Sequence, residues 1–119
     1  MYSILLKPAN TLKAGFSYAV SSSTGYIAGR WMPLSAGIEL TNRCNLRCPE
    51  CLSGSGLMTR PSGFMKRELF VTIISELRPY LLNLNLYFQG EPMLHPEFHD
   101  FVDLARGIPV TVSTNGHYL

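Results

Sequence analysis

The stretch Cys44-Asn45-Leu46-Arg47-Cys48-Pro49-Glu50-Cys51 is the most informative part of this 119-residue chain. It holds all three cysteines, in the spacing C-x3-C-x2-C. Three close thiols cannot all pair into disulfides, because one is always left over. Three thiolates can hold three corners of a cubic [4Fe–4S] cluster and leave one iron without a protein ligand. An open iron can take a small molecule, so the count points to chemistry at a cluster more than to electron storage.

A zinc site is the alternative interpretation of the cysteines, since three Cys and one His would complete a tetrahedral set. The three histidines, His95, His99 and His117, all lie more than forty residues downstream, and none has finger-like spacing. They are expected at the surface or at helix ends. The cluster is therefore favoured over zinc, and a structural disulfide is the least favoured of the three.

Two later motifs accompany the cysteines and make the pattern specific. Residues 38–43 (IELTNR) precede Cys44, residues 87–92 read YFQGEP, and residues 112–116 read VSTNG. Together, in this order, they resemble the signature of the radical S-adenosylmethionine (radical SAM) enzymes, from about residue 35 to residue 119. The resemblance implies the fold of that family, a partial (β/α)6 barrel with parallel strands.

The resemblance also implies a role for each motif. The three cysteines would bind a [4Fe–4S] cluster, and SAM would chelate the open iron and be cleaved reductively to a radical that modifies a substrate. Asn42 and Arg43 are expected to donate to cluster sulfides, with a solvated loop charge as the alternative for Arg43. The residues expected to bind SAM are Glu50, Gly90, Glu91, Pro92, Ser113, Thr114 and Asn115.

Two positions depart from the family pattern. Glu50 stands before the third cysteine, where the family often has an aromatic residue near the adenine, so a side-chain stack is put in doubt. Gln89 stands where the family often has the first of two glycines. Glu91 is expected to pair with the amino group of SAM as a charge-assisted partner.

Strands and helices alternate after residue 37, which predicts parallel βα units. We expect strands at 38–41, 84–88 and 109–114, helices at 66–78 and from 96 to about 107, and a loop at 52–63. Each motif then follows the carboxyl end of a strand, where ligand sites of parallel α/β folds lie. The strand aromatics Tyr87 and Phe88 are more often core residues than site residues.

The first 34 residues are predicted to be a helical extension, and residues 35–119 a truncated radical SAM core. Apolar positions such as Leu12, Phe16 and Val20 predict a helix over about 9–20, packed on the outside or end of the barrel, and the run 21–25 (SSSTG) weakens its continuation. Trp31 is expected to pack this segment against the barrel. A barrel of eight units uses about 31 residues per unit, so the core region looks like the first half of a barrel, either a fragment or a natural short product.

Composition narrows the function classes. The net charge is +2 with scattered cations, which argues against nucleic acid as a partner. No apolar run approaches the ~20 residues of a membrane span, no signal peptide is recognised, and reduced thiols suggest the cytoplasm. The motifs are most similar to SPASM-type members, which implies a peptide or protein substrate and an electron donor such as flavodoxin or ferredoxin. A non-catalytic iron–sulfur or zinc-binding fragment is the alternative function.

Overall fold

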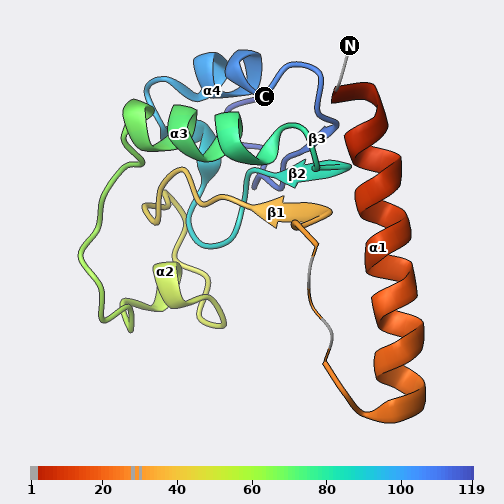
Figure 1. Ribbon diagram of the computed structural model, residues 1–119. Helices are drawn as coiled ribbons and strands as arrows, with labels where there is room; N and C mark the ends of the chain where they lie inside the picture. Colours follow the sequence, from red (N-terminus) through yellow and green to blue (C-terminus); the bar gives the residue numbers. More distant parts are fainter. Residues whose placement is uncertain (1–2, 28, 30) are drawn as a thin grey trace.

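The computed structural model describes residues 3–27, 29 and 31–119, and its elements are arranged as one small parallel sheet with helices around it (Figure 1). Residues 1, 2, 28 and 30 of the predicted extension lie outside the described part. The strands are β1 (Ser35–Gly37), β2 (Asn83–Asn85) and β3 (Val110–Thr111). The helices are α1 (Ser3–Thr24), α2 (Leu52–Ser55), α3 (Arg67–Leu77), the 3-10 helix η1 (Pro92–Leu94) and α4 (Phe98–Leu104). None of the described helices is long and apolar enough to cross a membrane.

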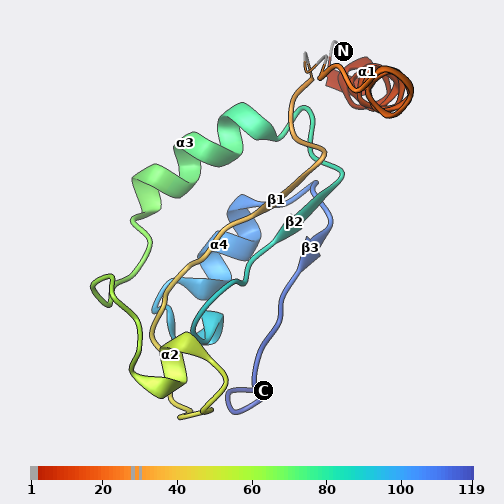
Figure 2. The same ribbon diagram turned by 90° about the horizontal axis from the view of Figure 1, so that it is seen from below.

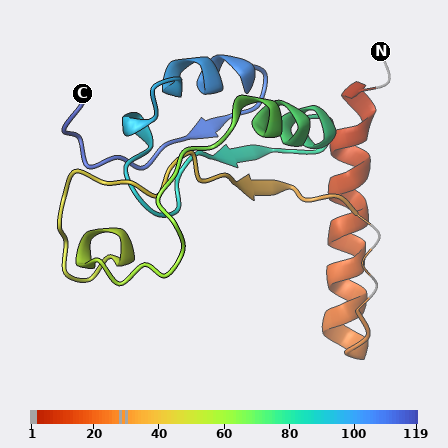
Figure 3. The same ribbon diagram turned by 90° about the vertical axis from the view of Figure 1, so that its left-hand side faces the viewer.

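The sheet has the order β1-β2-β3, and both neighbouring pairs are parallel. Ala36 is opposite Leu84, and Leu84 is opposite Val110. The connections run through α3 and then through α4, and both helices lie on the same side of the strands (Figure 3). The predicted alternation of strands and helices, with parallel strands, is confirmed.

The strands are shorter than predicted, and the first is displaced. The predicted strand 38–41 lies beyond β1, because the chain there turns from the sheet toward a downstream loop. Ile38 still donates its N–H to the carbonyl of Asn85, but the carbonyl of Leu40 accepts from Met65 and Thr41 forms an isolated antiparallel bridge with Phe64. The chain therefore leaves the parallel ladder after Ile38, one residue past the end of β1. The segments after β2 and β3 likewise leave it to form the motif loops.

The hydrophobic core lies between the sheet and the helices α3 and α4. Phe70 of α3 and Phe101 of α4 are fully buried, with ring centroids 4.5 Å apart. The predicted helix 66–78 is confirmed within a residue at each end as α3. The other buried apolar side chains are Ile38, Leu40, Ile74, Leu81, Leu84, Leu86, Phe98, Ala105 and Ile108.

His95 lies at a helix end, as the C-cap of η1, but it is buried in this core rather than at the surface. Its ring packs edge-on against Phe64 and Phe101, with centroids 5.2 and 4.6 Å away. Its Nε2 lies 3.0 Å from the carbonyl oxygen of Met65. An imidazole can be buried at modest cost when its ring nitrogen has a hydrogen-bond partner. Tyr87 and Phe88 were expected to be core residues, but both are exposed, Phe88 to 77%.

Helix α1 is longer than the predicted 9–20 and lies beside the amino ends of the strands (Figures 1 and 2). The serine-rich run continues the helix, because the hydroxyls of Ser23 and Thr24 donate to backbone carbonyls of the preceding turn. Its contact with the following segment uses Asn10, whose side chain exchanges two hydrogen bonds of 2.8 and 2.9 Å with the backbone of Met32.

The apolar stripe of α1 does not face the chain's own sheet. Leu5, Leu12 and Phe16 are each more than 70% exposed, whereas Asn10 is buried. The predicted N-terminal helix is confirmed, and it lies beside the amino ends of the strands with its apolar stripe largely exposed. The polar side faces inward because Asn10 supplies the backbone pairing that Met32 needs.

Candidate functional site

The three sequence motifs meet at the carboxyl edge of the sheet, on the side opposite α1 (Figures 1 and 3). Several hydrogen bonds join them directly, and two of these connect the second and third motifs to the first. The N–H of Glu91 donates to the carbonyl of Arg43 at 2.7 Å, and the side-chain amide of Asn115 donates to Oδ1 of Asn45 at 2.8 Å. Segments more than forty residues apart in the sequence therefore form one site.

The cysteine loop precedes α2 and carries three thiols that are not paired with one another. Cys44 and Cys51 are half-buried and Cys48 is exposed. The loop closes on itself through the N–H of Cys51, which donates to the carbonyl of Cys48 at 3.2 Å. A Cβ added to Gly54 would lie 2.5 Å from the backbone nitrogen of Cys48, so the first turn of α2 packs against the loop too closely for any side chain.

The thiols share this loop but are not gathered around one point. Within residues 3–27, 29 and 31–119, no group of three or more His, Cys, Asp or Glu side chains is arranged to hold a single metal ion. This applies to a zinc site and to a cluster alike, since the thiols would have to turn toward one point to hold either. His95 is committed to the core, as described above.

Gly90 lets the second motif pass against the backbone of the first. Its φ is +75°, a conformation that costs a residue with a side chain about 1–2 kcal/mol. A Cβ at this position would lie 2.6 Å from the carbonyl oxygens of both Thr41 and Arg43. Both the backbone conformation and the close approach therefore require glycine here.

Glu91 is the most buried charged residue of the site, with 1% of its surface exposed. Its Oε1 accepts from the backbone N–H of Met93 at 3.0 Å and from the hydroxyl of Thr114 at 2.8 Å. Its Oε2 accepts from the backbone N–H of Asn115 at 2.7 Å. Hydrogen bonds to a charged group contribute about 1.5–3 kcal/mol each, so the carboxylate firmly joins the second motif to the third. Pro92 follows at the first position of η1 and is also buried.

Asn115 extends this connection to the cysteine loop. Its Nδ2 lies 2.8 Å from Oδ1 of Asn45 and 3.9 Å from the sulfur of Cys44. Its Oδ1 accepts from the N–H of His117 at 3.0 Å, which fixes which end of the amide faces the loop. The sulfur of Cys44 also accepts from the N–H of Leu46 at 3.4 Å.

Gln89 and Glu39 are site residues for which the sequence analysis assigned no role. Oε1 of Gln89 accepts from the hydroxyl of Ser53 at 3.3 Å and lies 3.5 Å from the sulfur of Cys51. The N–H of Gln89 donates to Glu39, whose carboxylate also pairs with Arg60 at 2.6 Å. The hydrogen bond to Glu39 raises the pKa of Arg60. The departure of Gln89 from the family's glycine was the available signal, because a side chain there must lie beside the cysteine loop.

The expectation that Asn42 donates to cluster sulfides is wrong. Asn42 is buried, and its amide donates to the carbonyl of Pro61 at 2.9 Å while its Oδ1 accepts from Gly63. It therefore fixes the loop that follows α2. The guanidinium of Arg43 lies 4.6 Å from the ring centroid of Phe64, a cation–π contact rather than a contact with a thiol.

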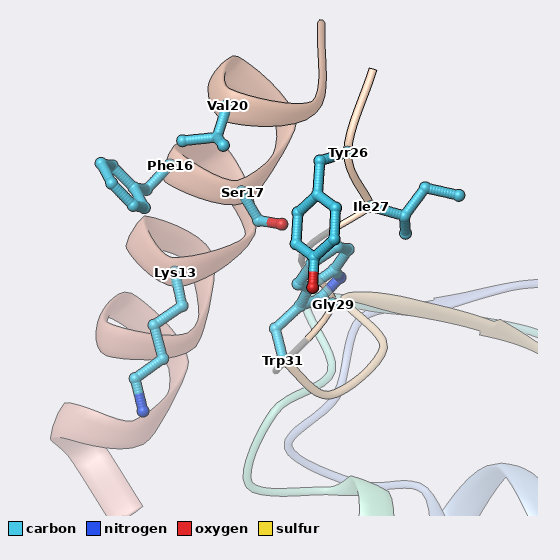
Figure 4. A pocket seen from close by; sticks show the side chains of 8 residues that line it. All are labelled: Lys13, Phe16, Ser17, Val20, Tyr26, Ile27, Gly29 and Trp31. Atoms are coloured by element: carbon cyan, nitrogen blue, oxygen red, sulfur yellow. The ribbon is translucent and has the colours of Figure 1, made fainter. Parts of the chain in front are cut away.

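The remaining predicted site residues are more loosely placed. Ser113 and Glu50 are exposed, and their predicted contacts with SAM stay predictions. An open hollow of about 300 Å³ lies next to the loop after Cys51, lined in part by Leu52, Phe88 and Gln89. A larger hollow, of about 610 Å³, lies between α1 and the segment that follows it (Figure 4). Its lining includes Phe16 and Trp31 but no residue of the three motifs, so it is separate from this site.

The chain is thus a parallel α/β unit with three unpaired thiols at its carboxyl edge, where two further motif loops meet them. No protein-family model matches it. It is 36% identical over 86 residues to the tungsten-containing aldehyde ferredoxin oxidoreductase cofactor-modifying protein of Pyrococcus furiosus. It is 39% identical over 87 residues to the mycofactocin maturase MftC of Mycobacterium ulcerans.

These alignments cover 69% and 71% of this chain but 24% and 23% of the relatives. The chain thus spans about a quarter of the length of the curated relatives it matches. The crystal structure of BtrN in complex with AdoMet and 2-DOIA matches with a TM-score of 0.64 and 22% identity, over 76% of this chain and 39% of BtrN. The chain belongs to the radical SAM superfamily and is homologous to radical SAM enzymes.

Proposed function

We propose that this chain binds a [4Fe–4S] cluster through Cys44, Cys48 and Cys51, and S-adenosylmethionine beside it, as the first part of a radical SAM enzyme. The observation that carries the proposal is the position of the three unpaired thiols at the carboxyl edge of a parallel sheet. The homology to radical SAM enzymes supports both cofactors. The remainder of a partial (β/α)6 barrel would complete the site, and residues 1–34 would form a separate helical extension.

Three thiolates are the donor chemistry that such a cluster takes, and the loop would have to bring them around one point. The three thiols are free of disulfides and lie on a loop that remains accessible to iron and sulfide, because Cys48 is exposed. Three thiolates without a fourth protein ligand leave one iron open. The sulfur of Cys44 accepts from the backbone N–H of Leu46, a contact that a thiolate keeps and that would orient it as a ligand.

When bound, the cluster supplies one electron for the cleavage of SAM and so gives access to radical chemistry. The chain's own residues bind and orient. Gly90 lets the backbone of the second motif approach the first, and Pro92 fixes the turn behind it. Ser113 and Glu50 are exposed, and together with Thr114 and Asn115 they would contact SAM. The predicted contact of Glu91 with the amino group of SAM would have to compete with its three internal donors.

The substrate and partners are part of the proposal as well. The similarity of the cysteine and Gly-Glu-Pro motifs to SPASM-type members supports a peptide or protein substrate. A small electron carrier such as flavodoxin or ferredoxin would reduce the cluster. The exposed position of Cys48 supports this, since electron transfer needs a short path from the surface.

Anaerobic reconstitution with iron and sulfide tests the proposal. We expect about four irons and four sulfides per chain, with an electron paramagnetic resonance signal after reduction that changes when SAM is added. Replacing any one cysteine by alanine should abolish this cluster, whereas Ser55→Ala on α2 should not affect it. Stoichiometric zinc without a reducible cluster would instead support the alternative, a non-catalytic metal-binding fragment.

A further inference from the structure

The buried carboxylate of Glu91 has both oxygens occupied by groups of the chain itself. Its acceptor sites are directed at Met93, Thr114 and Asn115. At 1% exposure it presents almost no surface to a ligand. A carboxylate arranged in this way acts on its neighbours, so the question is what its neighbours then do.

The neighbour that leads toward the thiols is Asn115. Its backbone N–H is held by Glu91, and its side-chain amide lies between Asn45 and Cys44. The bond from His117 to Oδ1 leaves only the Nδ2 hydrogens to face the cysteine loop. Asn115 therefore has its backbone fixed by the second motif and its side chain directed at the first.

We propose that Glu91 is a positioning residue that holds Asn115 so that the Asn115 amide donates to the cysteine loop at Asn45 and at the sulfur of Cys44. For its effect on a cluster, the inference rests on the proposed function. The hydrogen bonds from Glu91 through Asn115 to the cysteine loop are already present in the metal-free chain. A donor directed at a ligating sulfur withdraws electron density from it and makes the reduced cluster easier to form.

The first test uses the full metal-free chain and amide hydrogen exchange. In Glu91→Gln the amide oxygen should keep the side that accepts from Met93 and Thr114, so that the NH2 group faces the Asn115 N–H. The Asn115 amide should then exchange at least tenfold faster. In Asn115→Ala the N–H bond to Glu91 remains, but the amide that holds Asn45 is lost. Exchange should then increase in the cysteine loop while the Asn115 position stays protected.

The second test measures the midpoint potential of the reconstituted cluster. Asn115→Ala should lower the potential, so that the ratio of reduced to oxidised cluster at a fixed ambient potential falls two- to tenfold. Glu91→Gln should cause a similar fall, because it releases the same donor. In the double variant the two effects should not add, since both act through one amide. Tyr118→Phe, in the same C-terminal turn, is the matched control and should leave both measurements unchanged.

The outcomes separate the two proposals. A wild-type chain that assembles no cluster counts against the proposed function, while the exchange experiment on the metal-free chain still decides the connection. Unchanged exchange of Asn115 in Glu91→Gln overturns the positioning role. An unchanged potential in Asn115→Ala overturns the contact with Cys44, and additive effects in the double variant show that Glu91 acts by another route.

Discussion

The two ends of the parallel sheet are held together in different ways. At the carboxyl edge, the three motif loops are joined by buried polar contacts, of which the three hydrogen bonds to Glu91 are the centre. At the amino end, α1 is joined to the next segment through the two hydrogen bonds of Asn10, and its apolar stripe faces outward. Order at the carboxyl edge therefore comes from several specific donors and acceptors, whereas the hydrogen bonds between Asn10 and Met32 at the other end can be removed by one substitution.

The largest effect on the carboxyl edge is expected from Gly90→Ala. The new methyl group would meet the carbonyls of Thr41 and Arg43 at 2.6 Å and the residue would keep a φ of +75°. Left-handed strain of about 1–2 kcal/mol and overpacking of about 1–3 kcal/mol should lower the free energy of unfolding. Urea unfolding measures the change. Gly37→Ala, which has open space around its Cβ, is the control and should be well tolerated. Equal stability of the two variants would contradict the close approach at Gly90.

Thr114→Val should have the next largest effect. It removes the hydroxyl that donates to Glu91 and keeps the shape of the side chain. The carboxylate is then one donor short, which should cost about 1.5–3 kcal/mol in the free energy of unfolding. The control is Thr72→Val on α3, whose hydroxyl bonds within an exposed helix turn. A Thr114 variant no less stable than this control would show that the carboxylate does not depend on the hydroxyl.

Asn10→Ala should act on the other end only. Met32 would lose a donor and an acceptor, and α1 would open more often from the body of the chain. A loss of about 1–2 kcal/mol in this local contact corresponds to about 5–30-fold faster amide exchange in residues 31–35. The Asn115 amide should exchange as before. Faster exchange at both ends would show that the two regions are coupled rather than separate.

The smallest effect is expected from Gly15→Ala. Gly15 lies inside α1 with nothing within 4 Å of an added Cβ, so alanine should stabilise the helix by about 0.5–1 kcal/mol. Circular dichroism during thermal unfolding measures this gain. The spectrum of a reconstituted cluster should not change, because α1 lies at the opposite end of the strands (Figure 1). A destabilised variant would mean that α1 packs against something at Gly15.

Sequence patterns predicted the features that depend on local chemistry. The order of parallel βα units, the helix α3 and the meeting of three motifs at one edge followed from periodicity and from motif position. The exact strand limits did not follow, because Leu40 and Thr41 pair with residues 64 and 65 and no local signal announces such a contact. The sequence also did not show which side of α1 faces the rest of the chain. A periodic apolar stripe predicts an amphipathic helix, but it does not predict the surface against which the stripe packs.

Residue types predicted which residues lie in the candidate site better than they predicted which groups those residues contact. Glu91, Thr114 and Asn115 were expected to face one ligand, and the structure joins them to one another. Asn42 was expected to face the thiols because it precedes Cys44, but its amide is used to fix the loop at Pro61. Sequence spacing shows which groups are near, whereas the direction of a buried side chain depends on which backbone groups lack a partner.

The position of Trp31 gives the chain a built-in optical reporter. It is the single tryptophan and lines the hollow against α1, with about a third of its surface exposed (38%). The indole lies at the amino end of the strands, far along the molecule from the cysteine loop (Figures 1 and 4). The emission wavelength of Trp31 should therefore change when α1 moves away from this segment, without any added dye. Titrations at the carboxyl edge of the sheet can thus be monitored for a distant response in one fluorescence channel.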